Sequence, residues 1–365
     1  PFGVADLTML RGLRNIAPLL AIARPLARHD ALFPLEELRV AEVLVVAARM
    51  FSGRSEEGRP GQRLARALQE AGPSFIKLGQ ALSTRSDILG GEMAEDLSQL
   101  QDRLPPFPGN QARSAIEAEF AKPVDALFDH FDDNPIAAAS IAQVHLARTT
   151  EGDEVAVKVL RPGIEAAFAR DLDLFLWVAE RIEAARPEVR RLKPVESVKT
   201  LAATVTIEMD LRFEAAAAVE LAGNFAEDTT FNVADVDWTR TGRRVLTTGR
   251  VGGIPLDDRP AIIAAGLAPD EVLKKASTAF FLQVFRDGFF HADLHAGNLF
   301  VDAKGNVTAV DFGIMGRLDR RTRRHLGEML LAFLGRDYRR AAEVHFEAGW
   351  VPAPRSVDSF TQACR

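Results

Sequence analysis

The first 130 residues have the hydrophobic spacing of helices. Apolar residues recur at three- and four-residue intervals in GQRLARALQEAG (61–72), which a glycine ends. A proline in the next position suits the first turn of a second helix, PSFIKLGQALSTRSDIL (73–89). The run LPPFPG (104–109) predicts a loop, and helical spacing resumes in EAEFAKPVDALFDHF (117–131). We therefore expect a helical extension over residues 1–130.

Near residue 136 the pattern changes to short alternating runs. Two such runs in IAQVHLARTTEGDEVAVKVLRPG (141–163) flank a turn and predict a β-hairpin. Long helical patterns follow over 170–185 and over 195–225, the second of which is expected as one helix. VADVDW (233–238) and RRVLTTGRV (243–251) then look like the closing strands of a small sheet.

The last third of the chain combines helices with a second hairpin. PDEVLKKASTAFFLQVFRDG (269–288) predicts an amphipathic helix ended by its glycine. LFVDAKGNVTAVDFG (299–313) predicts a hairpin with an AKGN turn, and RLDRRTRRHLGEMLLAFL (317–334) predicts a helix soon after it. Strands and helices in this mixture predict an α+β fold.

Composition narrows the class of protein. The formal net charge of -6 argues against nonspecific nucleic-acid binding, which needs a basic surface. The single cysteine, Cys364, excludes an internal disulfide framework and a cysteine-rich zinc site. Near the N-terminus, Pro18, Arg24 and Pro25 interrupt the apolar run before it reaches membrane-spanning length. Because the first residue is Pro1, we expect a fragment of a longer chain.

The segment HADLHAGN (291–298) has the spacing of a phosphoryl-transfer loop. It lies between a predicted helix and a predicted hairpin, so rigid elements would present it. Asp293 and Asn298 are separated as in the protein-kinase loop H-R-D-x-x-x-x-N. In that loop the aspartate orients the attacking hydroxyl, and the asparagine helps to bind magnesium.

A second acidic motif, DFG, follows at Asp311. Magnesium prefers hard oxygen donors, so Asp311 would be the main metal ligand. The alternative is a transition-metal site made by His291, Asp293 and His295. The asparagine and the later DFG favour magnesium, and they make His291 a structural residue that braces the loop.

The segment VAVK (155–158) has the form of the kinase V-A-I-K motif. A lysine on this strand, Lys158, would neutralise phosphate charge if an acid on a later helix held it in place. The candidate acids are Glu208, Asp210 and Glu214. Asp210 and Glu214 would share a helical face, because they are four positions apart. A surface lysine and a solvated acidic face are the alternatives.

Upstream of VAVK, an alanine-rich segment takes the place of the kinase glycine loop. Ala137, Ala139 and Ala142 occupy the three glycine positions, and Val144 occupies that of the valine. Alanine disfavours positive φ and favours helix, so we expect a more helical loop that holds a nucleotide differently. The predicted nucleotide-binding residues are Ala137, Ala138, Ala139, Ser140, Ile141, Ala142, Val144 and Lys158. The alternative is a buried turn of small residues that binds nothing.

The segment FIKLGQALSTRSD (75–87) has one polar face. On a helix, Lys77, Gln80 and Thr84 would lie together, and the apolar residues between them would supply packing contacts. From periodicity alone, this polar stripe is interpreted as facing solvent.

Together these motifs resemble those of the UbiB family, called ADCK in animals, which are atypical kinase-like proteins that support ubiquinone biosynthesis. The resemblance spans about residues 60–345 and rests on KLGQ, AAASIAQV, VAVK, EMD, HADLHAGN and DFG. It implies a two-lobed protein-kinase-like fold with ATP and Mg²⁺ as cofactors. Residues 1–130 would be the N-terminal helical extension, 131–250 the N-lobe with a helical insert, and 251–365 a truncated C-lobe.

The resemblance also assigns roles to single residues. Lys158 would contact the nucleotide phosphates and pair with Glu214, and Asp293 would be the catalytic-loop aspartate. Asn298 and Asp311 would hold magnesium. The regulatory residues of the family's KxGQ and ExD motifs would be Lys77 and Gln80, facing Glu208 and Asp210. This changes the interpretation of the Lys77 stripe from solvent-facing to inward-facing.

Two departures from ordinary kinases argue against protein phosphorylation. The long segment between Lys158 and Glu214 implies the helical insert in the N-lobe. After Asp311 there is no A-P-E motif, and the immediate helix leaves little room for a peptide-docking segment.

The function expected from these features is that of an atypical kinase or ATPase at a membrane. Expected partners are ATP, anionic membrane lipids, quinone precursors and other ubiquinone-biosynthesis proteins, but no nucleic acid. In a bacterium it would act at the cytoplasmic face of the inner membrane, peripherally or anchored by segments outside this chain. The basic run 317–325 suits anionic lipid, and a solvated helix start is its alternative.

Two other functions are compatible with parts of the sequence. A catalytically weak or silent scaffold for ubiquinone-biosynthesis enzymes would bind nucleotide or isoprenoid lipid without turnover, but it has no need for an intact Lys158, Asp293, Asn298 and Asp311. A small-molecule phosphotransferase of the aminoglycoside-kinase type would have the same arrangement of catalytic-loop residues, but this function leaves KLGQ and EMD without a role.

Overall fold

A computed structural model describes residues 18–33, 58–100, 104–185, 187–352 and 355–365. The chain forms two compact units. The first comprises Pro1–Asp210 and Gly242–Leu246, and the second Leu211–Thr241 and Thr247–Arg365. Parts of the predicted extension, residues 1–17, 34–57 and 101–103, lie outside the described residues. The predicted division at residues 130 and 250 stays a prediction.

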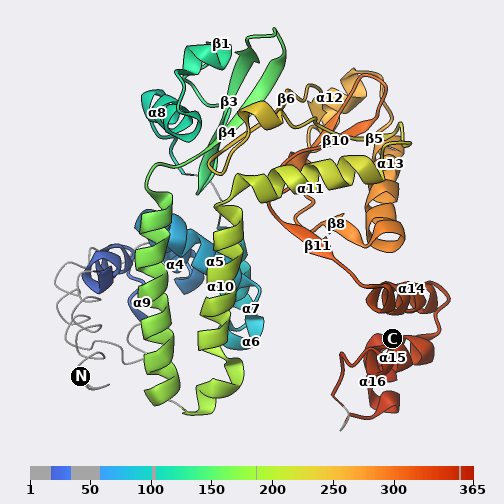
Figure 1. The fold of residues 1–365 in the computed structure, drawn as a ribbon. Coiled ribbons are helices and arrows are strands. Elements are labelled where there is room, and N and C mark those ends of the chain that lie inside the picture. Colours follow the sequence, from blue (N-terminus) through green and yellow to red (C-terminus); the bar gives the residue numbers. More distant parts are fainter. Residues whose placement is uncertain (1–17, 34–57, 101–103, 186, 353–354) are drawn as a thin grey trace. The chain divides into compact units, whose positions relative to one another are not determined.

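The first unit begins with short helices that pack on one another (Figure 1). Residues 18–28 are helical, and they are followed by α4 (Pro60–Ala71), α5 (Pro73–Ser83), α6 (Ser86–Leu89) and α7 (Gly91–Ser98). The helix predicted over 61–72 is confirmed, whereas the one predicted over 73–89 is interrupted at Thr84 and Arg85. At Gly79 of KLGQ, α5 lies against Leu68 and Leu100, which leave no room for a side chain.

A sheet follows, in the order β1-β3-β4-β6 with β2 paired to β3, and β1, β2 and β4 each run antiparallel to β3. Its strands are β1 (Phe128–Phe131), β2 (Ala137–Ala138), β3 (Ala142–Thr149), β4 (Glu154–Leu160) and β6 (Val245–Gly249). The predicted hairpin of β3 and β4 is confirmed, as is the strand predicted over 243–251. One face of the sheet packs on α8 (Gly109–Phe120), with Val155, Val157 and Val159 in the shared core.

The helix predicted over 117–131 is wrong in its second half. α8 ends at Phe120, where Ala121 takes a left-handed conformation with φ 51°, and Pro123 cannot continue the helix. After a short 3-10 turn, η1 (Val124–Ala126), the chain becomes β1. Pairing with β3 and burial of Phe128 and Phe131 override the helical spacing there.

A pair of long helices follows the β3–β4 hairpin. It consists of α9 (Ile164–Ala185), a 3-10 segment η2 (Pro187–Leu192) and α10 (Pro194–Glu208). α9 and α10 lie side by side, and α9 also contacts α5 (Figure 1). This is the helical insert that the sequence predicts.

The single helix predicted over 195–225 is wrong, because it is broken at Met209 and Asp210. α10 ends at Glu208, and α11 (Leu211–Asn224) begins the second unit. Aspartate favours caps and turns over helix interiors, since its carboxylate competes for backbone N–H groups. Asp210 is therefore not helical, and the predicted common helical face with Glu214 does not exist.

The second unit has two small sheets around a hydrophobic core. One has the order β5-β10-β9-β7, and the other pairs β8 with β11. The strands are β5 (Phe231–Val233), β7 (Ile254–Pro255), β8 (Phe289–His291), β9 (Leu299–Val301), β10 (Val307–Ala309) and β11 (Met315–Arg317). The predicted hairpin over 299–313 is confirmed as β9 and β10. Of the strand predicted over 233–238, only Val233 lies in β5, and the chain then turns into η3 (Trp238–Arg240).

Helices cover the rest of the second unit. They are α12 (Arg259–Ala264), α13 (Pro269–Phe281), α14 (Arg320–Leu334), α15 (Tyr338–Glu347) and α16 (Val357–Cys364). α13 continues as a π-helical segment, η4 (Leu282–Asp287), and ends at Gly288, as predicted. In the described ranges, no helix combines the length and the apolar character needed to cross a bilayer.

Candidate functional site

The HADLHAGN loop joins β8 to β9 in the second unit and is fixed by its own backbone. The Asp293 carbonyl accepts a hydrogen bond from the His295 N–H at 3.0 Å and one from Asn298 Nδ2 at 3.3 Å. The loop then closes in a 3-10 turn, η5 (Ala296–Asn298), with Asn298 largely buried. Because Nδ2 donates inside the loop, the amide oxygen of Asn298 is the atom left to act as a ligand.

His291 braces the start of this loop. Its N–H donates to Gln283 Oε1 at 3.0 Å, and its ring Nδ1 accepts from the Asp293 N–H at 3.2 Å. Nε2 faces the Val310 carbonyl at 3.4 Å, which fits a neutral ring protonated on Nε2. Burial lowers the pKa of His291, against the opposing effect of the nearby Val310 carbonyl and the Asp311 and Asp293 charges, and so favours this neutral form.

The DFG segment lies directly beside the HADLHAGN loop. The Val310 N–H donates to the Asn298 carbonyl at 2.9 Å, and the Ala292 N–H donates to the Ile314 carbonyl at 3.0 Å. Asp311 itself has φ 63°, a left-handed conformation that aspartate tolerates better than most residues. Such strained backbone is common at functional sites. The structure therefore brings the segments that carry Asp293, Asn298 and Asp311 together, and the roles of these residues stay predictions.

Glu214 joins these residues from α11. Glu214 is buried. Its Oε2 and Asp311 Oδ1 both lie close to Gly313: a Cβ atom on that glycine would be 3.9 Å from the first and 3.5 Å from the second. The two carboxylates thus border the DFG glycine within one unit. Lys158 belongs to the other unit, so its pairing with Glu214 stays a prediction.

The oxygen donors of this site fit magnesium better than a transition metal. Magnesium is commonly held by one or two carboxylates together with phosphate oxygens and water, which suits Asp311 and the Asn298 amide. Among the residues placed by the structure, no three His, Cys, Asp or Glu side chains are grouped to hold a metal ion. In addition, Nδ1 of His295 accepts a hydrogen bond from the Gly297 N–H at 3.2 Å. The alternative site of His291, Asp293 and His295 therefore has no support.

The alanine-rich segment forms a hairpin turn, so the expectation of a more helical loop is wrong. The Ile136 N–H donates to the Val144 carbonyl and the Ala139 N–H to the Ala142 carbonyl, both at 2.8 Å. None of the residues 137–142 is among the positive-φ residues of the described chain. The turn therefore needs no glycine, and pairing with β3 overrides the helical preference of alanine.

Strand register puts three predicted nucleotide-binding residues in one row. Ala137 pairs with Val144, and Val144 pairs with Lys158 on the next strand. Residues directly opposite each other on neighbouring strands project to the same face. The neighbours of Lys158, Val157 and Val159, are buried in the core with α8, so Lys158 projects from the other face. This face is the candidate nucleotide surface of the first unit.

The KLGQ and EMD segments meet within the first unit. Lys77 Nζ lies 2.9 Å from Glu208 Oε2, with 13% and 7% of the two side chains exposed. The Lys77 stripe is therefore inward-facing at this residue. A contact of Gln80 with Asp210, and the regulatory role of these four residues, stay predictions.

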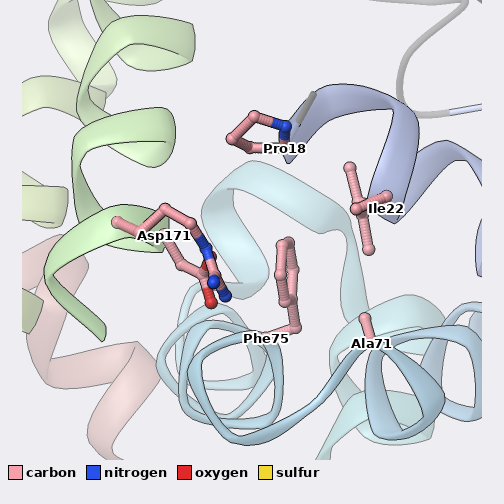
Figure 2. Close-up of a pocket in the computed structure, with 7 residues that line it drawn as sticks. Pro18, Ile22, Ala71, Phe75 and Asp171 are labelled. Atoms are coloured by element: carbon pink, nitrogen blue, oxygen red, sulfur yellow. The ribbon is translucent and has the colours of Figure 1, made fainter. Parts of the chain in front are cut away.

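A separate hollow of about 330 Å³ lies in the helical part of the first unit. Figure 2 shows Pro18, Ile22, Ala71, Phe75 and Asp171 around it. Both oxygens of Asp171 already accept hydrogen bonds, from Ser74 Oγ at 2.7 Å and from Arg170 Nε at 2.9 Å. Arg170 also lines the hollow, and none of the predicted nucleotide-binding residues does.

Three residues that support the site are not predicted from the sequence: Gln143, Arg161 and Gln283. Gln143 and Gln283 are buried, and Arg161 follows Lys158 by three positions. None of their contacts is signalled by spacing along the chain. The available signal was a polar side chain inside an otherwise apolar segment, since such a group needs a partner when it is buried.

The chain matches a known family of domains over most of its length. A model of the ABC1 atypical kinase-like domain matches residues 99–345. The Probable protein kinase UbiB of Marinobacter nauticus is 44% identical over 343 residues, which are 93% of this chain and 63% of that protein. A protein of the same name from Xylella fastidiosa is 42% identical over 311 residues, 84% of this chain and 56% of that protein. The chain thus spans about three fifths of the length of these curated relatives.

A solved structure is similar in fold. It is the complex of Rv3197 with erythromycin from Mycobacterium tuberculosis, with a TM-score of 0.56 and 24% sequence identity. The match covers 88% of this chain and 78% of that one. Together with the family match, it confirms the predicted α+β, kinase-like fold class and the predicted family.

Proposed function

The chain belongs to the family of ABC1 atypical kinase-like domains, and from this premise we propose that it binds Mg-ATP and acts as an atypical kinase or ATPase in ubiquinone biosynthesis. The observation that carries the proposal is the convergence of Asp293, Asn298, Asp311 and Glu214 in the second unit. The β8–β9 loop, the segment that follows β10 and the helix α11 supply these oxygen atoms, and hydrogen bonds between the loop and the segment hold them side by side.

Each residue has a role that its environment supports. Asn298 and Asp311 would hold magnesium, which when bound neutralises phosphate charge. Asp293 would orient the hydroxyl or water that attacks the terminal phosphate. Its backbone is fixed by His291, His295 and Asn298. Lys158 would contact the nucleotide phosphates beside Ala137 and Val144.

The acceptor is proposed to be a small molecule or water in place of a protein. α14 begins at Arg320, soon after the DFG motif, which leaves little chain for docking a peptide. The partners we propose are anionic membrane lipids, a quinone precursor and other ubiquinone-biosynthesis proteins. In a bacterium the protein would work at the cytoplasmic face of the inner membrane.

Magnesium-dependent ATP turnover tests this function. We expect wild-type protein to hydrolyse ATP, and to do so faster with anionic liposomes and a phenolic quinone precursor. Asp311→Asn should lower the rate at least about 100-fold, the scale of losing one electrostatic contact to the transition state. The matched control is Asp302→Asn, in the β9–β10 turn, which should retain the wild-type rate.

Two results would contradict the proposal in different ways. Equal rates for wild type and Asp311→Asn under every condition would remove the catalytic role. Nucleotide binding without any turnover would favour the scaffold function.

A further inference from the structure

Arg161 holds the alanine-rich turn from behind. Its Nε donates to the Ser140 carbonyl at 3.0 Å, and its Nη2 donates to the Ala139 carbonyl at 3.1 Å. Its own N–H donates to the Ile141 carbonyl at 2.8 Å. One residue at the end of β4 therefore binds three successive carbonyls of the turn, two through its planar guanidinium and one through its backbone N–H.

These contacts set the direction of the peptide N–H groups. In a trans peptide the C=O and the following N–H point in opposite directions. With the Ala139 and Ser140 carbonyls held toward Arg161, the N–H groups of Ser140 and Ile141 point to the opposite side of the turn. Within the part of the chain that the structure describes, neither N–H donates a hydrogen bond.

Ser140 adds a third unsatisfied donor at the same place. It is completely buried, and its Oγ has no hydrogen-bond partner. Unsatisfied buried polar groups are costly, and each needs an explanation. Successive backbone N–H groups in a turn are a known form of anion site, so phosphate oxygens would supply the missing acceptors.

The same arginine also binds the loop that precedes α8. Its Nη2 donates to the Pro105 carbonyl at 2.8 Å, and its guanidinium lies 5.4 Å from the centre of the Phe107 ring. Gln143, on β3, forms two hydrogen bonds with the backbone of Phe107. Its Oε1 accepts from the Phe107 N–H at 3.0 Å, and its Nε2 donates to the Phe107 carbonyl at 3.1 Å. Upstream of this loop, Leu100 lies against Gly79 of KLGQ.

We propose that Arg161 is a positioning residue for nucleotide phosphates: it presents the Ser140 and Ile141 N–H groups to them, and Phe107 holds its guanidinium in place. This inference rests on the proposed function, since it assumes that the turn binds a nucleoside triphosphate. It also links the turn to the loop of Pro105 and Phe107, which precedes α8.

The test compares variants of Arg161 by nucleotide affinity and turnover. We expect Arg161→Gln to weaken binding of the non-hydrolysable analogue Mg-AMPPNP at least tenfold, measured by calorimetry. The KM for ATP should rise by the same factor, while kcat stays within about twofold, because the residue does not touch the reacting atoms. Arg161→Lys should recover part of the affinity, since an ammonium can still reach one carbonyl.

The control is Arg148→Gln. Arg148 lies on β3 and pairs with the exposed Asp129, so its loss should leave both constants unchanged. Phe107→Leu is the second variant. It removes the ring beside the guanidinium but keeps the backbone clasped by Gln143, and we expect about a threefold loss of affinity.

The outcomes separate the two proposals. A wild-type protein that binds no Mg-AMPPNP overturns the proposed function, and this inference with it. A wild-type protein that binds, with an Arg161→Gln variant that is folded and binds equally well, overturns the inference alone. If Arg161→Gln does not fold, equal affinity of Phe107→Leu and wild type overturns it instead.

Discussion

Two lysine–glutamate pairs in the first unit have the same separation and very different exposure. Lys77 and Glu208 are 2.9 Å apart and almost fully buried, whereas Lys193 and Glu196 are 2.9 Å apart with two thirds of each side chain exposed. Water screens the second pair but not the first. Removing Glu208 takes a desolvated ionic partner away from Lys77, which is costly in a buried pair.

We therefore expect Glu208→Gln to lower the free energy of unfolding by about 3–5 kcal/mol. The matched change Glu196→Gln should cost at most about 0.5 kcal/mol. Urea unfolding of both variants and the wild type measures the difference. Equal costs would mean that solvent reaches Lys77 and Glu208 as readily as the exposed pair.

His145 predicts a pH dependence of stability. It is buried, its Nδ1 lies 2.8 Å from the Asp132 carbonyl, and its Nε2 lies 2.8 Å from Gln143 Nε2. The first contact needs a proton on Nδ1 and the second needs none on Nε2, so the ring is neutral. Burial lowers the pKa of His145, and the Asp132 carbonyl together with the Asp132 and Asp133 charges only partly offsets this effect.

A lowered pKa fixes the sign of the effect. The unfolded protein takes up the proton near the ordinary histidine value of about 6.5, and the folded protein resists it to lower pH. The stabilisation is complete above about pH 6.5 and is lost as the pH falls through the folded pKa. His145→Gln should flatten the decline of the unfolding free energy between pH 7.5 and 5.5. It should not abolish the decline, because the pKa of His291 is also lowered. An unchanged slope would contradict this role of His145.

At the scale of elements, the β2–β3 turn replaces a flexible glycine loop with a fixed one. Cross-strand hydrogen bonds and Arg161 hold it, and each alanine carries a Cβ that limits how closely a phosphate can approach the backbone.

Ala139→Gly removes one Cβ and adds backbone freedom. We expect tighter nucleotide binding, or new autophosphorylation, with a loss of stability of about 0.5–1 kcal/mol. Calorimetry with Mg-AMPPNP and radiolabel transfer from ATP measure the two gains, and Ala156→Gly on β4 is the control for backbone freedom alone. If neither gain is seen, the alanines do not shape the nucleotide site.

The elements that the sequence predicts well are those with a clear period and a clear end. The helix over 61–72, the two hairpins and the helix ended by Gly288 are examples. β1 was missed because its four residues show no alternation: the two phenylalanines at its ends are buried and the two residues between them are exposed. The break at Asp210 was missed because the apolar spacing continues across it.

The residues of the candidate site also divide into those that the sequence predicts and those that it does not. Asp293, Asn298 and Asp311 were predicted because their spacing along the chain is itself the motif. Arg161 and Gln143 were not, because their partners Ala139, Pro105 and Phe107 are reached only after the chain folds. Motif spacing identifies the residues proposed to contact a ligand, but not the residues that position those side chains and backbones.

At the scale of the whole molecule, a net charge of -6 opposes contact with an anionic membrane. The proposed lipid partner therefore requires a local basic surface. The first turns of α14 provide one, with Arg320, Arg321 and Arg324 exposed. Arginine is unfavourable near the positive end of a helix dipole, although Arg324 is offset by its pair with Glu328 at 2.7 Å on the same helix.

We expect Arg320→Gln/Arg321→Gln to weaken binding to phosphatidylserine-containing vesicles by about 2 kcal/mol, or roughly thirtyfold, in co-sedimentation. Wild-type binding should also weaken as salt rises from 50 to 300 mM, because screening shortens the range of attraction. Arg191→Gln/Lys199→Gln removes the same charge elsewhere and should have little effect. Equal binding of the two double variants would leave the arginines as a solvated helix start.

The β3–β4 hairpin has one end that tolerates change and one that does not. At Gly152 the turn is open, with nothing within 4 Å of an added Cβ, whereas Lys158 and Arg161 depend on an unbroken register with β3. Natural length variation in relatives should therefore gather at residues 150–153 and avoid 158–161. For the same reason, that turn is the place to insert a fluorescent reporter or an affinity tag without disturbing the nucleotide surface.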